Sequence, residues 1–323
     1  MCTRVFWNDN GTALIVGRTM DWPESTEPIL TIFPRGTRHD GGLLLGERIV
    51  ADNALVWEAA YGTLVVSVYG LGAAEGVNEA GLAAHMLYLN ETDFGPVDPE
   101  RPAIHAALWV QYLLDNAATV QEALELQSAL QLVMAEARGA LSTVHLALED
   151  ATGDSAVIEY VEGRPTVYHD AAHRVMTNSP PFDQQLALLA QRDFAEPASS
   201  ISLPGNVESV DRFTRASYFL NVLPTPGNER EAMASMLAVI RNCSIPFGAP
   251  YKDEGVLNTE YRVVNDLTNR RLFFEMATLP SVIWVDWGAL DFSEGSGVRT
   301  LDPDDLSLSG NVTDRFAPAS VGF

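Results

Sequence analysis

The residue best placed to do chemistry in this 323-residue chain is Cys2, which becomes the N-terminal residue if Met1 is removed. It then carries a thiol and a free α-amine on one backbone unit. Because an α-amine has a reference pKa of about 8, part of it is free base in neutral water and can take the proton of the thiol. The pattern therefore predicts a cysteine nucleophile with its own general base.

Arg18 and Asp21 follow at a spacing that can return them to Cys2. A cation beside a thiol lowers the pKa of that thiol, and a carboxylate beside an ammonium holds the ammonium in place. Residues 3–8 and 13–19 read as two strands joined by a turn that contains Asn-Gly, so we expect a hairpin that brings the three residues together. Taken singly, a Cys at position 2 is usually incidental and the other two are usually surface residues, so the prediction depends on the combination.

Two further residues are suited to support such a nucleophile. Asn178 follows a strand-like run at residues 175–177, where its side-chain amide can donate to a developing oxyanion, although an ordinary turn Asn would show the same pattern. Arg212 lies one or two turns into a helix expected from residue 207, and its simpler interpretation is a surface ion pair. These residues alone leave both alternatives open.

The elements that must position these residues alternate in blocks of strands and helices. Strands are expected at residues 3–8, 13–19, 29–34, 54–59, 62–68, 72–77, 81–89, 145–148, 155–161, 165–168, 175–177, 261–265, 272–277 and 282–285. Helices are expected at residues 103–116, 119–127, 183–191, 207–222 and 229–241, loops at 37–42 and 197–204, and a short element or loop at 132–138. Segregated blocks favour an α+β fold with antiparallel sheets over a doubly wound parallel sheet.

Composition and charge exclude several classes of protein. The chain has 20 basic and 43 acidic residues, a formal net charge of −23, which disfavours nucleic acid and anionic membranes as partners. No run approaches the roughly 18 apolar residues of a membrane span, and two cysteines, Cys2 and Cys243, do not make a disulfide framework. No secretory signal follows Met1, which indicates the cytoplasm if Met1 is the native start and the periplasm or exterior if a signal peptide was removed.

The common hydrolase and nucleotide-binding motifs are missing from the sequence. It contains no G-x-S-x-G, H-E-x-x-H or P-loop pattern. Residues 70–76 approximate a dinucleotide fingerprint, but the last Gly comes one position late and no helix is expected after it. The six histidines show no metal-ligand spacing, and we expect His105 and His145 to pack in or beside the core.

Several motifs, in order along the chain, resemble the choloylglycine hydrolase family, which comprises the penicillin V acylases and bile salt hydrolases of the N-terminal nucleophile (Ntn) superfamily. They are Cys2 and residues 17–22, 76–82, 157–160, 176–180 and 203–213. The resemblance implies an α+β fold, a four-layer αββα sandwich of two antiparallel sheets, as one domain over residues 1–323 with Met1 removed. It also implies hydrolysis of a small-molecule N-acyl amide with no metal or organic cofactor.

The resemblance assigns roles to the residues found above. Cys2 is expected to attack the amide carbonyl and carry the acyl-enzyme, while Arg18 and Asp21 tune its thiol and α-amine. Arg212 is expected to support the charge network, and Asn178 to donate to the oxyanion.

Tyr88 and Trp22 bear on the substrate. The resemblance implies that the backbone N–H of Tyr88 completes the oxyanion hole, and its side chain stands where bile salt hydrolases tend to have Asn and penicillin V acylases an aromatic residue. With Trp22 it offers flat walls suited to a phenoxyacetyl or fatty acyl group, unless both rings simply fill the core.

The spacing between two motifs bears on the branch of the family. Only 33 residues separate Asn178 from Arg212, which resembles the shorter, Gram-negative branch of the family, whose members also resemble N-acyl homoserine lactone acylases. The longer branch carries an insertion here that helps tetramer assembly, so the spacing leaves a homo-oligomer open.

Three functions therefore compete. The first is an amidohydrolase of the penicillin V acylase type, with N-acyl homoserine lactones as a possible natural substrate. The second is a bile salt hydrolase, which Tyr88 in place of Asn disfavours. The third is an inactive sandwich that binds acyl amides, which the joint presence of the five expected catalytic residues disfavours.

Overall fold

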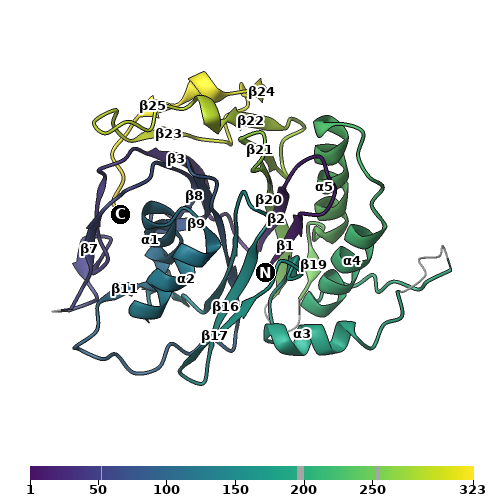
Figure 1. Ribbon diagram of the computed structural model, residues 1–323, viewed down its shortest axis with the longest axis horizontal. Coiled ribbons are helices and arrows are strands. Elements are labelled where there is room, and N and C mark those ends of the chain that lie inside the picture. The colour runs from purple at the N-terminus through teal and green to yellow at the C-terminus, as the bar shows by residue number, and fades with distance from the viewer. Residues whose placement is uncertain (52, 195–199, 252–254) are drawn as a thin grey trace.

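Two large β-sheets lie face to face in the computed structural model, which describes every residue except 52, 195–199 and 252–254 (Figure 1). Within the described residues the first sheet has eight strands. Its order is β18 (Val175–Met176), β1 (Cys2–Trp7), β2 (Ile15–Trp22), β20 (Val256–Asp266), β21 (Arg271–Met276), β22 (Ile283–Asp286) and β24 (Gly310–Asn311), with β19 (Ala249–Pro250) also paired to β20. We call it the Cys2 sheet because Cys2 begins one of its strands.

The second sheet, here the facing sheet, has nine strands in the described part of the chain. Its order is β17 (Arg164–His169), β16 (Ser155–Val161), β15 (Val144–Glu149), β10 (Ala83–Tyr88), β9 (Gly72–Asn78), β8 (Thr63–Val68), β3 (Ile29–Phe33), β23 (Arg299–Leu301) and β25 (Ala317–Pro318). Neighbouring strands in both sheets are antiparallel except β22 and β24, which run parallel. The expected antiparallel sheets are therefore present, with that one exception.

Helices cover the outer face of each sheet, as Figure 1 shows. Helices α1 (Trp109–Asn116) and α2 (Val120–Ala129) lie on the facing sheet, and α4 (Ser209–Val222) and α5 (Glu229–Cys243) lie on the Cys2 sheet. Helix α3 (Phe182–Leu189) packs on α4. The layer order is that of the predicted αββα sandwich. Among the described residues, no helix is both long enough and apolar enough to cross a membrane.

Short elements complete the described fold. They are the strand pairs β4 (Arg38–Asp40) with β7 (Val56–Glu58), β5 (Leu43–Leu44) with β6 (Glu47–Arg48), β11 (Ala103–His105) with β12 (Gln131–Val133) and β13 (Glu136–Ala137) with β14 (Ala140–Leu141), and the 3₁₀ turns η1 (Ala106–Leu108), η3 (Trp287–Ala289) and η4 (Thr313–Arg315).

Two expectations for this part of the chain were wrong. Residues 103–116 do not form one helix, because Ile104 pairs in parallel with Leu132 and the helix begins only at Trp109. Residues 37–42 are not wholly loop, because His39 pairs with Trp57 in β4 and β7. In both places a pairing with a distant segment overrides the local pattern.

The start of α2 follows its sequence signal. The Thr119 hydroxyl accepts from the backbone N–H of Glu122 at 3.2 Å, and the Glu122 carboxylate accepts from the N–H of Ala118 at 2.8 Å. These bonds satisfy two N–H groups that the first turn cannot pair within the helix. The predicted helix start is confirmed, and His105 and His145 are buried as expected.

The hairpin of β1 and β2 places Cys2 opposite Met20 and Arg4 opposite Arg18. Its turn is longer than a two-residue loop and is organised by Asn10, whose side-chain oxygen accepts from the N–H groups of Thr12 and Ala13 at 2.9 Å. The predicted return of β2 beside Cys2 is therefore confirmed.

Helix α5 lies very close to β2 at Gly17. A Cβ at that position would be 2.6 Å from Cγ2 of Ile240 and 2.9 Å from the sulfur of Met236. Only glycine permits this approach, which presses α5 onto the strand that carries Arg18 and Asp21.

Candidate active site

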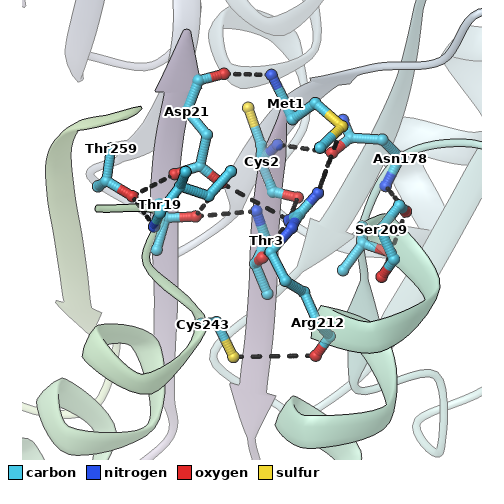
Figure 2. A network of polar contacts seen from close by, with 12 residues as sticks. Met1, Cys2, Thr3, Thr19, Asp21, Asn178, Ser209, Arg212, Cys243 and Thr259 are labelled. Atoms are coloured by element: carbon cyan, nitrogen blue, oxygen red, sulfur yellow. Dashed lines mark hydrogen bonds and ion pairs between the residues drawn. The ribbon is translucent and has the colours of Figure 1, made fainter. Parts of the chain in front are cut away.

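Cys2 begins β1 and is 3% exposed. Its Sγ lies 3.4 Å from Nη2 of Arg18. In this structure Met1 precedes it and extends the strand: the N–H of Asp21 donates to the Met1 carbonyl at 2.7 Å, and the Met1 ammonium donates to the Asp21 carbonyl. The backbone N–H of Cys2, which becomes the α-amine when Met1 is absent, donates to Oδ1 of Asn178 at 2.6 Å (Figure 2).

Arg18 is a fully buried cation that connects the two sheets. Its Nη1 donates to Glu75 at 2.6 Å and to the Tyr261 hydroxyl at 2.8 Å, while Nη2 donates to the carbonyl of Met86 at 3.3 Å. Burial alone would lower the pKa of Arg18, but Glu75, Tyr261 and Cys2 together outweigh burial and raise it. The guanidinium beside the Cys2 thiol is therefore permanently charged.

The Asp21 carboxylate is held by three partners. Oδ1 accepts from the hydroxyl of Thr259 at 2.5 Å, Oδ2 accepts from that of Thr19 at 3.0 Å, and Oδ2 lies 3.6 Å from Nη1 of Arg212. Asp21 itself is fully buried. These contacts fix the carboxylate at the end of β2, next to the backbone of Cys2 (Figure 2).

Arg212 lies in the interior on α4, so its interpretation as a surface ion pair is wrong. Its Nε donates to the Val207 carbonyl at 2.9 Å, and Nη1 donates to the Cys2 carbonyl and the Thr3 hydroxyl, both at 2.5 Å. Nη2 donates to Oδ1 of Asn178 at 2.8 Å. One guanidinium thus clamps the first residues of β1 to α4 and to Asn178.

Asn178 uses both ends of its amide inside this cluster. Oδ1 accepts from Cys2 and Arg212, while Nδ2 donates to the carbonyl of Tyr88 at 2.6 Å. Its backbone N–H donates to the Ser209 hydroxyl at 2.8 Å. Because an amide nitrogen carries two hydrogens, Nδ2 keeps one hydrogen besides the one that it donates to Tyr88. Asn178 therefore has more than the role of an ordinary turn residue.

The backbone N–H of Tyr88 lies on the same edge of β10 as the carbonyl that accepts from Asn178. Tyr88 lies opposite Val144 in the ladder, and the next residue, Leu89, donates its N–H to Thr143 at 2.9 Å. Donors alternate along an antiparallel pair, so the N–H of Tyr88 points to the other edge of β10, where its carbonyl meets Asn178.

An apolar cavity of about 160 Å³ opens beside Cys2 and Arg18. Trp22 and Tyr88 line it, and their rings meet edge to face with centroids 6.1 Å apart and planes at 60°. Both side chains are only half-buried, so the rings form a cavity wall and do not simply fill the core. Met20, Val68 and Leu71 complete much of the remaining apolar lining.

The sequence interpretation missed several residues of this cluster. Glu75 and Tyr261 bind Arg18, and Thr259 binds Asp21. The only signal for Glu75 was a charge within the otherwise small and apolar run Gly72–Asn78, a strand buried along its length.

Comparisons with known proteins identify the family of this chain. A family model described as linear amide C–N hydrolases, choloylglycine hydrolase family, matches residues 2–301. The penicillin V acylase of Pectobacterium atrosepticum is 36% identical over 348 aligned positions, which cover 98% of this chain and 90% of the relative. A solved penicillin V acylase from Agrobacterium tumefaciens has a TM-score of 0.88 at 35% identity, covering 99% of this chain and 98% of the other. A mutant conjugated bile acid hydrolase from Clostridium perfringens, at 18% identity, shares the fold with a TM-score of 0.79 over 96% of this chain and 98% of the other.

Proposed function

Because this chain belongs to the choloylglycine hydrolase family and is a hydrolase of linear amide C–N bonds, we propose that Cys2 is the nucleophile that performs this cleavage. The observation that carries the proposal is the 3.4 Å approach of Arg18 to Cys2 Sγ at the wall of an apolar cavity. A buried, permanently charged guanidinium favours the thiolate, which is the reactive form. The proposal requires that Met1 be removed, since only then does Cys2 have a basic α-amine.

The first half-reaction transfers the acyl group to sulfur. The Cys2 α-amine takes the thiol proton, and the thiolate attacks the carbonyl carbon of the substrate. The carbonyl oxygen becomes an oxyanion that accepts from Nδ2 of Asn178 and the backbone N–H of Tyr88. When the C–N bond breaks, the leaving amine takes the proton from the Cys2 ammonium, and a thioester remains on sulfur.

The second half-reaction returns the free enzyme. The α-amine removes a proton from water, the hydroxide attacks the thioester carbon, and the same two donors hold the oxyanion. The C–S bond breaks, the acid leaves and the thiolate regains its proton. Asp21 and Arg212 hold the backbone of Cys2 in place through both steps, because Arg212 donates to its carbonyl at 2.5 Å and pairs with Asp21 at 3.6 Å.

We propose small N-acyl amides with an aryl or straight acyl group as substrates, with penicillin V as the test compound and long N-acyl homoserine lactones as natural candidates. The cavity wall made by Trp22 and Tyr88 supports this, because flat rings pack well against an aryl ring or a methylene chain. Similarity to the Pectobacterium atrosepticum penicillin V acylase supports the same class. The alternative is a bile salt substrate, which more distant similarity to the conjugated bile acid hydrolase of Lactobacillus acidophilus, at 22% identity, supports.

The test compares amine release from penicillin V, a long-chain acyl homoserine lactone and glycocholate, on protein whose loss of Met1 is established by intact mass. Preference for either of the first two supports the proposed substrate class, and preference for glycocholate would replace it with the alternative. Cys2→Ala should abolish turnover with the fold kept, and Cys2→Ser should retain little, because a hydroxyl is harder to deprotonate. Appreciable activity of Cys2→Ala would refute the nucleophile, and tight binding without turnover by the Met1-free wild type would indicate an acyl-amide-binding protein.

A further inference from the structure

Five buried charged residues form a continuous row of ion pairs between the two sheets, which we call the charge row: Arg4, Glu149, His85, Glu75 and Arg18. Arg18 contacts Glu75 at 2.6 Å, and the second oxygen of Glu75 lies 3.1 Å from Nδ1 of His85. Nε2 of His85 lies 2.6 Å from Glu149, whose other oxygen accepts from Nε of Arg4 at 2.9 Å. None of these side chains is more than 2% exposed.

The two ends of the charge row come from the same hairpin. Arg4 and Arg18 lie directly opposite each other in β1 and β2, an arrangement of like charges that destabilises a strand pair unless anions intervene. The facing sheet supplies them: Glu75 on β9 and Glu149 on β15, with His85 on β10 between them.

The geometry fixes the protonation state of His85. Both ring nitrogens lie close to carboxylate oxygens: Nδ1 is hydrogen-bonded to Glu75 at 3.1 Å, and Nε2 is in a 2.6 Å ion-pair contact with Glu149 that lacks hydrogen-bond geometry. Carboxylate oxygens only accept hydrogen bonds, whereas a neutral imidazole has a single N–H to donate. The imidazolium is therefore the form that fits. Burial alone would lower the pKa of His85, but Glu149 and Glu75 outweigh burial and raise it.

With His85 charged, the signs alternate along the row and sum to +1, and Arg18 forms the end that meets Cys2 Sγ at 3.4 Å. A thiolate on Cys2 continues the alternation and brings the sum to zero. With neutral His85, the charges of the row already sum to zero without a thiolate. Glu75 then pairs with Arg18 alone, so Arg18 stabilises a thiolate on Cys2 less. Uncompensated charge is costly in the interior, so the state of His85 bears on the state of Cys2.

We propose that His85 is a positioning residue for the Cys2 thiolate: by binding one oxygen of Glu75, it leaves the charge of Arg18 available to the sulfur. The inference rests on the proposed nucleophile and adds a residue that touches neither Cys2 nor the cavity. The groups that surround His85 are Glu75 from β9 and Glu149 from β15, with Arg18 and Arg4 beyond them. Tyr261 from β20 is uncharged, because burial raises the pKa of its hydroxyl far above the usual value.

The test measures ionisation of Cys2 directly, as the pH dependence of its alkylation by iodoacetamide in Met1-free protein. Cys243 should not react at a pH well below 12, because burial raises the pKa of its thiol to about 12. His85→Gln removes one positive charge from the row and should raise the apparent pKa of Cys2 by about one unit, the effect of a unit charge roughly 12 Å away in an effective dielectric of about 20. The acid limb of kcat/KM for amide hydrolysis should move with it.

A second variant has the opposite expectation. Glu75→Gln removes the anion that offsets Arg18, so the apparent pKa of Cys2 should fall, whereas general damage to the fold would move both variants the same way. His105→Gln is the matched control, since His105 is equally buried but contacts the carbonyl of Leu43, away from the charge row, and Cys2 should titrate in it as in the wild type.

Each outcome decides the proposal. A folded His85→Gln protein whose Cys2 titrates as in the wild type, or lower, overturns it. If His85→Gln does not fold, Glu75→Gln decides, because an unchanged or raised pKa of Cys2 there also overturns it. If Cys2 is not the nucleophile, Cys2→Ala will still hydrolyse the substrate, and this result is separate from the test of His85. The alkylation of Cys2 can be measured whether or not the protein turns over substrate.

Discussion

The aromatic wall of the cavity makes a prediction that separates substrate binding from chemistry. Tyr88→Leu removes the ring but keeps the backbone N–H proposed for the oxyanion hole. Tyr88 and Trp22 meet edge to face at 6.1 Å and form one wall, so an aryl acyl group packed against this wall would gain about 0.5–1.5 kcal/mol from ring contacts. Burial of roughly 40 Å² more apolar surface adds about 1 kcal/mol. Loss of both terms lowers kcat/KM about 10- to 70-fold.

The assay compares two substrates with one leaving group, phenoxyacetyl-p-nitroanilide and acetyl-p-nitroanilide, by absorbance of the released nitroaniline. The acetyl group is too short to span the wall, so its kcat/KM should change less than threefold. Trp22→Leu should behave in the same way, and the double variant should show a coupling of about 0.5–1.5 kcal/mol between the rings. Trp284→Leu is the control, because Trp284 packs on Phe273 in β22 and β21.

An equal loss on both substrates would refute this reasoning, because it would mean that the rings act through the fold or the reacting groups. No loss on the phenoxyacetyl substrate would place the acyl group elsewhere. Trp284→Leu should leave kcat/KM unchanged for both the phenoxyacetyl and the acetyl substrate.

Three further predictions concern stability. Gly17→Ala should lower the free energy of unfolding by about 1–3 kcal/mol in urea, because its Cβ would lie 2.6 Å from Ile240, and unchanged stability would show that α5 shifts freely. Burial raises the pKa of Asp115 to about 8, so the folded state keeps a proton that the unfolded state loses near pH 4, and stability falls between these values by up to about 1.4 kcal/mol per pH unit. Asp115→Asn should lack this pH dependence. In unfolding measurements at pH 5 and pH 8, the free energy of unfolding of the variant relative to the wild type should therefore be higher at pH 8. A difference that is the same at both pH values would contradict the raised pKa of Asp115. Arg212→Met should cost about 3–5 kcal/mol in thermal unfolding, because it leaves the Asp21 carboxylate buried without its cation. Arg212→Lys should recover part of the loss, and an equal loss in both would point to packing instead of charge.

Local signals in the sequence were sufficient for much of the fold. The Asn-Gly turn and the strand pattern on both sides of it predicted the β1–β2 hairpin, and that hairpin alone brings Arg18 and Asp21 to Cys2. The cap pair at Thr119 and Glu122 likewise marked the start of α2. These features depend on residues that are neighbours in the chain, which is why a sequence can reveal them.

Features that depend on distant pairings were not predictable. Strand β11 exists because Ile104 pairs with Leu132, and no periodicity marks a three-residue strand. The charge row was missed because Glu75 and His85 are paired with Arg18 and Glu149 from strands far away in the sequence, and no local pattern reveals such pairings. Asn178 and Arg212 were joined to the predicted site only through the family resemblance, since nothing in the pattern alone placed Arg212 in the interior.

The placement of Met1 bears on how an active sample is made. Met1 is 5% exposed and packs against Ile245, Tyr251 and Leu257, so a peptidase acting from outside cannot reach the bond between Met1 and Cys2 once the sheet has formed. If Cys2 is the nucleophile as proposed, the removal of Met1 must therefore happen on the nascent chain or by chemistry inside the fold. In the first case, synthesis that outpaces trimming produces two populations with one fold, of which only the trimmed one turns over. Specific activity would then differ between preparations with expression rate and temperature, and counting free N-terminal cysteines would be the proper basis for every rate constant.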